Sequence, residues 1–211
     1  MPATMQVKTM EIIKDIEQGS EEWHALRLGI ITMSPASCLL VKGKGEGGFG
    51  AGALTYMHEL IAERFSGLPS AFFSTEHTER GHRDEPIATS LYEMQTGNDV
   101  ELVTIILNHG VGYSPDGLVG SDGLTEVKSK LGRLQVDILL KQEVPKEHET
   151  QIQGGLWVSE REWLDFISYS EGLPLFVKRV YRDEDYIRTL AQRVKDFYEI
   201  MQEKIELITN L

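Results

Sequence analysis

The chain has little cysteine, no long apolar run and no surplus of positive charge. Its 211 residues include one cysteine, Cys38, which excludes an internal disulfide and fits a reducing cytoplasm. No segment approaches the roughly 18 consecutive apolar residues of a membrane helix. The N-terminus carries acids and lacks an apolar stretch, so it is not typical of a signal peptide. We therefore expect a cytoplasmic protein that does not enter a membrane.

Acidic residues outnumber basic ones. The 33 Asp and Glu residues against 21 Lys and Arg residues give a net charge of −12, which argues against a protein coated with positive charge for nucleic acid. A groove needs only local basic residues, however, and a metal site concentrates acids, so specific motifs decide the question. The length and the ordinary content of 41% hydrophobic and 26% charged residues predict one domain over residues 1–211.

The segment 112–130 organises the chain. Two short runs with strand character flank the turn sequence at 120–123, which predicts a β-hairpin. Asp116 lies on the first run. Glu126 and Lys128 lie two residues apart on the second run, so they share a face of the strand. A closed hairpin would bring these two carboxylates and one ammonium together.

Oxygen ligands of this kind suit Mg²⁺ or Mn²⁺. The spacing from Pro115-Asp116 to Glu126-Val127-Lys128 matches the PD-(D/E)xK nuclease motif. In such a site Asp116, Glu126 and the Val127 carbonyl hold the cation, and Lys128 positions the attacking water. Taken alone the motif is loose, because an ordinary surface hairpin with an exposed ion pair would have the same pattern.

The remaining periodicity predicts helices around strands. We expect an N-terminal arm over 1–18, a helix opened by Ser20, a helix over 53–65, and a long amphipathic helix over about 183–208. Further predicted elements are a strand over 100–107, a helix over 146–158 that Pro145 opens, and strands over 162–169 and 175–181. This is an α/β (α+β) pattern.

Two segments could contact DNA. Ser34 precedes a proline and predicts a helix start, whose N–H groups could bind a phosphate together with the Arg27 guanidinium. A capped helix and a surface arginine is the simpler alternative. The stretch 42–52 is too rich in glycine to pack, so we expect a flexible loop. Its Lys42 and Lys44 either follow a DNA backbone or lie in solvent.

Glu85 precedes Pro86 at the expected start of a helix that ends at Thr96-Gly97. Its carboxylate could point into the metal site as a third acid. Alternatively it is an acid that the helix dipole favours in a first turn.

Several stretches follow one another in a recognisable order: 19–23, 27–34, 81–85, 92–97, 114–119, 126–128 and 151–157. Together they resemble the lambda-type exonucleases, also called YqaJ-like viral recombinases, over about residues 19–170. The sequence departs from that family at Pro86, where an uninterrupted helix is expected, and at Met33-Ser34-Pro35, which replaces the more usual Ala-Ser.

The resemblance implies a restriction-endonuclease-like core with a central mixed β-sheet flanked by helices. It implies a 5′→3′ exonuclease that uses two divalent ions on double-stranded DNA. By position, the family's metal ligands correspond to Asp116, Glu126 and the carbonyl of Val127. Its other catalytic residues correspond to Lys128, Glu85 and Gln153. The pocket that grips the 5′-phosphate resembles Arg27, Ser34 and Ser114.

The resemblance also implies partners. Family members are typically homotrimeric rings that thread DNA, and a single-strand annealing protein would be the partner in phage recombination. Lys42, Lys44 and the C-terminal helix are then candidates for the channel and the subunit interface. The motif leaves two alternatives: an endonuclease or repair nuclease of the same superfamily, and a non-catalytic module that binds DNA ends.

Overall fold

The computed structural model describes residues 9–70 and 76–211, with side chains over 9–70 and 79–211. Of the predicted N-terminal arm, residues 1–8 lie outside this part, and the remainder contains the short strand β1 (Glu11–Ile13). No helix in the described ranges combines the length and the apolar character that a membrane span requires.

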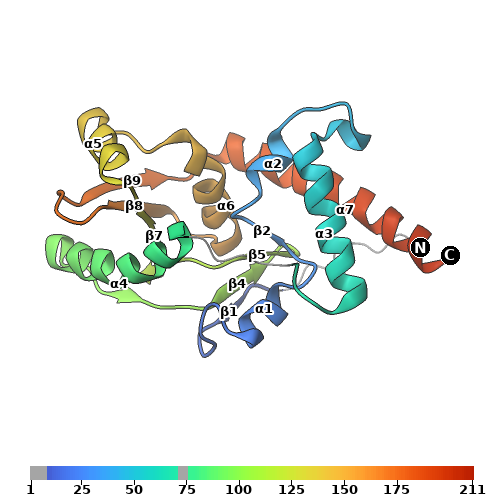
Figure 1. Cartoon of the computed structure of the whole chain (residues 1–211), viewed down its shortest axis with the longest axis horizontal. Helices are drawn as coiled ribbons and strands as arrows, with labels where there is room; N and C mark the ends of the chain where they lie inside the picture. The colour runs from blue at the N-terminus through green and yellow to red at the C-terminus, as the bar shows by residue number, and fades with distance from the viewer. Residues whose placement is uncertain (1–8, 71–75) are drawn as a thin grey trace.

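The strands of the described residues form two sheets (Figure 1). The four-stranded sheet has the order β1-β4-β5-β2, with β4 (Ile105–Asn108), β5 (Val111–Tyr113) and β2 (Ile31–Thr32). The five-stranded sheet has the order β3-β6-β7-β8-β9, with β3 (Val100–Glu101), β6 (Gly117–Val119), β7 (Gly123–Ser129), β8 (Trp163–Tyr169) and β9 (Phe176–Tyr181). This second sheet is mixed, because β7 and β8 are parallel and its other pairs are antiparallel.

The chain changes sheet at two places. It leaves β5 and enters β6 across residues 114–116. The predicted strand over 100–107 is likewise split, since β3 pairs with β6 whereas β4 pairs with β1 and β5. The prediction of one strand was wrong because the apolar run continues through the bend, where the Thr104 hydroxyl donates to the carbonyl of Ile16 at 2.5 Å.

Helices cover both faces of the five-stranded sheet. α4 (Glu76–Thr96) packs on the face that carries Val127 and Ile167. Neighbouring residues of a strand point to opposite faces, so Glu126 and Lys128 face the other side, where α6 (Glu149–Ser159) lies. α5 (Gly132–Lys141) and the 3-10 helix η2 (Lys146–His148) connect β7 to α6. Figure 1 shows α4 below this sheet, α5 above it and α6 to the right of β7, β8 and β9.

The remaining helices surround the four-stranded sheet. They are α1 (Glu21–Arg27), which Ser20 caps as predicted, α2 (Ser37–Leu40), the 3-10 helix η1 (Glu46–Gly48), α3 (Ala51–Ser66) and α7 (Glu184–Thr209). Helix α7 occupies the position of the predicted long helix and buries one face, with Leu190, Val194, Phe197 and Met201.

The glycine-rich stretch 42–52 is packed, which corrects the prediction of a flexible loop. Phe49 is fully buried, and its ring lies 5.5 Å from that of Phe197 on α7. Arg193, also on α7, places its guanidinium 3.7 Å from the centre of the Phe49 ring and donates to the Gly47 carbonyl at 3.0 Å. Glycine lets the chain approach closely here, and one aromatic residue anchors it.

Candidate active site

The predicted hairpin closes between β6 and β7. Gly117 pairs with Thr125, and Val119 pairs with Gly123 across the turn. The ladder ends at Gly117, so Asp116 stands just outside it, beside the later residues of β7. There the Asp116 carboxylate accepts a hydrogen bond from the Val127 N–H at 2.5 Å. A glycine is needed at 117, because a Cβ at that position would lie 2.2 Å from Val100.

The same hydrogen bond places the Val127 carbonyl. In an antiparallel ladder, the N–H and C=O of one residue face the same neighbouring strand. The Val127 N–H points to Asp116, so its carbonyl points to that edge as well. The backbone oxygen and the Asp116 carboxylate therefore share the edge of β7 that lies beyond the hairpin ladder.

Glu126 is the centre of a buried hydrogen-bond network. Its carboxylate is 1% exposed. One carboxylate oxygen accepts from the Lys128 ammonium at 2.5 Å and from the Gln151 amide at 2.6 Å, and the other accepts from the Tyr113 hydroxyl at 2.9 Å. The exposed ion pair of the simpler interpretation is therefore wrong. Strand β5, strand β7 and helix α6 each supply a side chain that fixes this carboxylate.

Glu85 reaches the same cluster from α4. The helix runs unbroken through Pro86, so Glu85 lies in its interior and not at its start, as the sequence suggested. Burial raises the pKa of the Glu85 carboxyl, and the negative charge of Glu126 raises it further. Burial, together with the charges of Glu126 and Glu85, holds the pKa of Asp116 well above its ordinary value.

The cluster has a surplus of negative charge. Burial disfavours the Lys128 ammonium, but the charges of Glu126 and Asp116 outweigh this effect, so the pKa of Lys128 lies above its ordinary value. Three carboxyl groups, those of Glu85, Asp116 and Glu126, share this cluster with one ammonium, and the raised pKa values of Glu85 and Asp116 show that burial and mutual repulsion disfavour their ionised forms. A divalent cation would stabilise the ionised carboxylates.

The donor set fits such a cation. Within the described residues no group of three His, Cys, Asp or Glu side chains is arranged to hold a metal. The protein thus offers two carboxylates, of Asp116 and Glu126, and the Val127 carbonyl. Magnesium is usually held by one or two carboxylates, with water and substrate phosphate completing its shell. These residues therefore suit a hard divalent cation, whose remaining ligands would be water and substrate phosphate.

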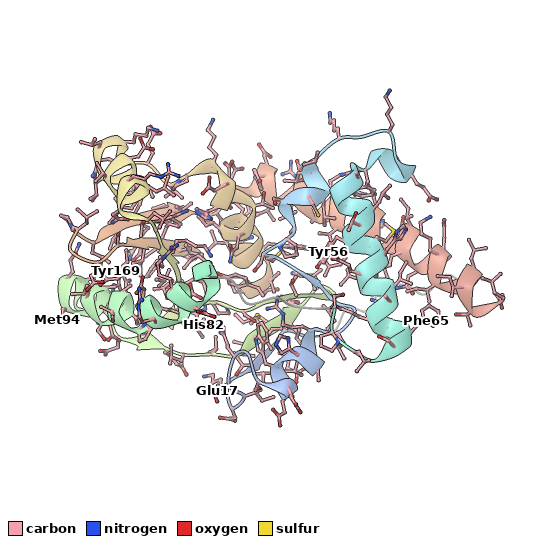
Figure 2. The ribbon with its side chains drawn as sticks, viewed as in Figure 1. Glu17, Tyr56, Phe65, His82, Met94 and Tyr169 are labelled. Carbon is pink, nitrogen blue, oxygen red and sulfur yellow. The ribbon has the colours of Figure 1, made fainter. Side chains whose placement is uncertain are left out.

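A cavity of about 680 Å³ adjoins the cluster. Its lining includes Trp23, Arg27 and Thr32, Tyr56 of α3 and His82 of α4, and Figure 2 labels Tyr56 and His82. His82 stands one turn before Glu85, so the cavity extends along α4 towards the acidic cluster. The acids of the cluster do not themselves line the cavity; His82 and the contact of Arg27 with Ser114 connect the two.

Arg27 is held in this cavity by uncharged groups. Its guanidinium donates to the hydroxyls of Ser114 and Thr32, each at 3.4 Å, and stacks 4.1 Å from the centre of the Trp23 ring. The Trp23 indole also donates to Ser114 at 3.3 Å. Burial lowers the pKa of Arg27, although an arginine remains charged at any physiological pH. Arg27 is half-buried, and its direct contacts are hydroxyls and a ring, although the charge of Glu63 on the cavity wall also acts on it. A cation without a direct carboxylate contact suits an anionic ligand.

Two predicted residues lie elsewhere. Gln153 is 4% exposed, donates to the Tyr181 carbonyl at 3.0 Å and accepts from the Asp183 N–H at 2.9 Å. It braces the start of α7, so its assignment to the active site was wrong. Ser34 is exposed in a turn before α2, and that helix begins after Ala36. Thr32, not Ser34, contacts Arg27.

Lys42 and Lys44 are exposed, on the segment packed against α7. Ser114 lies beside Arg27 as the resemblance implied.

Sequence reasoning missed Gln151 and Tyr113. The available signal was Gly155, four residues after Gln151 and therefore on the same face of α6. A Cβ on Gly155 would lie 2.6 Å from the Tyr113 ring. The close approach of Gly155 to Tyr113 turns Gln151 towards Glu126.

Comparisons with known proteins identify the family and the fold. The family model for the YqaJ-like viral recombinase domain matches residues 22–162. An alkaline exonuclease from Laribacter hongkongensis has a similar structure, with 31% identity and a TM-score of 0.82, over 90% of this chain and 97% of that protein. Its complex with dAMP matches at 32% identity, with the same TM-score and the same coverage of both chains.

A phage-related exonuclease from Haemophilus somnus shares the fold at 16% identity, with a TM-score of 0.64, over 89% of this chain and 98% of that one. No curated protein sequence matches the chain.

Proposed function

The chain belongs to the YqaJ-like viral recombinase family, and we propose that it is a magnesium-dependent exonuclease. It degrades the 5′-phosphorylated strand of double-stranded DNA in the 5′→3′ direction and leaves a 3′ overhang. Recombination of phage DNA by single-strand annealing would use that overhang. The strong similarity to an alkaline exonuclease supports the nuclease activity. The local geometry supports the polarity and the metal.

One observation carries the polarity. Ser114, which touches the Arg27 guanidinium, and Asp116, which touches the β7 backbone, are separated by one residue. A terminal phosphate bound by Arg27 and Ser114 would thus lie next to the group that cleaves. The related exonuclease has been crystallised with dAMP, which belongs to the class of product that such a spacing releases, a 5′-mononucleotide.

The metal site would be formed by Asp116, Glu126 and the Val127 carbonyl, and we propose that it holds two Mg²⁺ ions, which Mn²⁺ could replace. When bound, the cations lower the pKa of a water and stabilise charge on the phosphate. Lys128 stays protonated, since its pKa is raised. Its ammonium therefore orients the attacking water and stabilises its negative charge, and it does not act as the base.

The other residues position these groups. Gln151 and Tyr113 hold the Glu126 carboxylate in one orientation. Glu85 lies close enough to Asp116 for its charge to raise the pKa of that residue, and its carboxyl group would position a water at the site. Arg27, with Trp23 and the Ser114 hydroxyl, binds the 5′-phosphate.

The proposal includes an assembly and a setting. Three chains form a ring around the DNA, a single-strand annealing protein takes over the exposed 3′ strand, and the reaction occurs in the cytoplasm of a phage-infected cell. Membership of the family supports this part of the proposal. Lys42 and Lys44, which are exposed, are the proposed contacts to DNA in the channel.

A linear duplex labelled at one 5′-phosphate tests the activity. With Mg²⁺, the label is expected in mononucleotides from the first seconds, and chelation by EDTA stops its release. Covalently closed circular duplex is expected to stay intact, because the enzyme needs an end. Nicking of the circle would instead indicate an endonuclease. Release of label only after the opposite strand is shortened would contradict the 5′→3′ polarity.

A further inference from the structure

We propose a second phosphate-binding site at the C-terminal end of β7, formed by Arg80 and Lys130, for the backbone phosphate that follows the scissile one on its 3′ side. The inference rests on the proposed exonuclease function and adds a subsite to it. The ligand is a single phosphodiester of the strand being degraded.

Arg80 lies on the edge of β7 that carries the metal ligands. It donates to the Ser129 hydroxyl at 3.0 Å and to the Ser129 carbonyl at 3.4 Å. Ser129 follows Val127 by two residues, so its carbonyl points to the same side of the strand as the Val127 carbonyl. Arg80 therefore contacts the same edge of β7 as Asp116 does, at Ser129, which lies about 6.6 Å further along the strand than Val127.

The buried Asp84 carboxylate holds the Ser129 hydroxyl that Arg80 contacts. The Ser129 hydroxyl donates to Asp84 at 2.6 Å, and the Asp84 carboxylate is 4% exposed and also accepts from Arg83. The guanidinium has five N–H donors, and its two contacts use part of them. A half-buried arginine held at a strand edge can accept a phosphate without much loss of side-chain entropy.

Lys130 supplies the second cation. It approaches the end of β7 from the face that carries Glu126 and Lys128, whereas Arg80 approaches from the face covered by α4, so the phosphate would lie at the end of the strand between them. Its side chain is 12% exposed, and its ammonium lies 2.8 Å from His148 and 3.1 Å from Glu147. Burial, followed by the charge of Lys130, lowers the pKa of His148 to about 4. His148 is thus neutral at physiological pH and accepts a hydrogen bond from Lys130.

Among the ion pairs of the described residues, Lys130 is paired with one carboxylate, that of Glu147, which is largely exposed. The Lys130 side chain is consequently held in place while its positive charge is only partly offset. The exposed Arg133, in the first turn of α5, adds positive charge beside it.

The three sites lie in sequence along the molecule. Tyr56 lines the Arg27 cavity, His82 stands beside the acidic cluster, and Tyr169 pairs with Ser129 at the end of β7. Figure 2 shows these three residues one after another along the long axis. The spacing suits a strand whose 5′-phosphate, scissile phosphate and next phosphate are bound in that order.

The test uses 5′-phosphorylated duplexes in which one phosphate is an uncharged methylphosphonate, and kcat/KM is measured with Mg²⁺. Placed immediately 3′ of the scissile phosphate, the modification is expected to lower kcat/KM of the wild type by about three- to tenfold. Lys130→Gln and Arg80→Gln are expected to show a similar loss on unmodified duplex, and no further loss on the modified one. Salt dependence is an independent readout. Each of the two variants loses roughly one phosphate contact, so the slope of log affinity against log salt concentration should become less steep by about one.

Two controls complete the design. Lys195→Gln changes an exposed lysine of α7 and is expected to behave as wild type throughout. Lys130→Arg and Arg80→Lys keep the charge and are expected to keep the sensitivity to the modification, which separates binding from folding. The phosphate site is overturned if the loss from the substitution and the loss from the methylphosphonate multiply, or if the variants are as active as wild type. Either result leaves the exonuclease proposal standing. A wild type that does not degrade unmodified duplex overturns the exonuclease proposal and this subsite with it.

Discussion

Lys128→Met removes one ammonium and keeps most of the aliphatic stem. In the wild type the Glu126 carboxylate, 1% exposed, accepts from Lys128, Gln151 and Tyr113. Loss of a hydrogen bond to a charged group costs about 1.5–3 kcal/mol. Two donors remain, so the cost stays below the about 3–5 kcal/mol of a buried pair broken completely. About 2 kcal/mol lowers the Tm of a chain of this size by about 4–8 °C.

The effect on turnover should be much larger. The pKa of Lys128 is raised, so its charge is present at neutral pH beside the position of the attacking water. Loss of such a group lowers kcat by about 10²–10⁴-fold. We expect a folded protein with a modest fall in Tm and almost no exonuclease activity.

The assay compares kcat on a saturating 5′-phosphorylated linear duplex with Tm measured in the absence of divalent ions. Lys195→Met, on the exposed face of α7, is the matched control and should change neither quantity. Turnover within twofold of wild type by a folded Lys128→Met would refute the role given to the ammonium. A Tm equal to that of wild type would refute the energetic importance of its contact with Glu126.

The remaining variants test the rest of the site. Arg27→Gln should reduce the preference for 5′-phosphorylated over 5′-hydroxyl ends by about tenfold or more, and equal preference in wild type would exclude the phosphate pocket. Gln151→Leu should lower kcat and also cost about 1.5–3 kcal/mol of stability, since it removes one hydrogen bond to the Glu126 carboxylate. Gln153→Leu should lower stability by about 1–3 kcal/mol and leave kcat nearly unchanged; a loss of kcat in Gln153→Leu and not in Gln151→Leu would contradict the two placements. The Asp165 carboxylate accepts from Tyr92 at 2.8 Å, and burial followed by that contact raises the pKa of Tyr92 to about 12. Because the pKa is higher in the folded than in the unfolded protein, the neutral Tyr92 contributes up to about 2.7 kcal/mol to the free energy of unfolding. This contribution is present below pH 10 and is lost as the pH rises from 10 to 12. Urea unfolding of Tyr92→Phe should lack this part of the decline, and parallel pH profiles of the two proteins would contradict it.

Local spacing was enough to predict the centre of the site. Asp116, Glu126 and Lys128 lie on one hairpin, and a hairpin needs only a turn and alternation to bring them together. Ser114 and Arg27 were likewise found together. The division into two sheets was not predictable in this way, since nothing in the apolar run at 100–107 marks where the chain leaves one sheet for the other.

Long-range packing explains the errors. The rotation of α6 about its axis decides between Gln151 and Gln153, and contact of Gly155 with Tyr113 sets it. The stretch 42–52 looks flexible from its glycines alone, yet Arg193 holds it from about 150 positions later in the chain. No window of local sequence contains both partners of such a contact.

Isothermal titration calorimetry with Mn²⁺ on wild type and Asp116→Asn tests the metal site most directly. The substitution keeps the volume and the hydrogen bond to the Val127 N–H, and it removes one negative charge. Saturable binding by wild type and at least about tenfold weaker binding by the variant are expected, since a charged oxygen ligand is lost. Identical isotherms, or no binding to either protein, would contradict a cation held by Asp116 and Glu126.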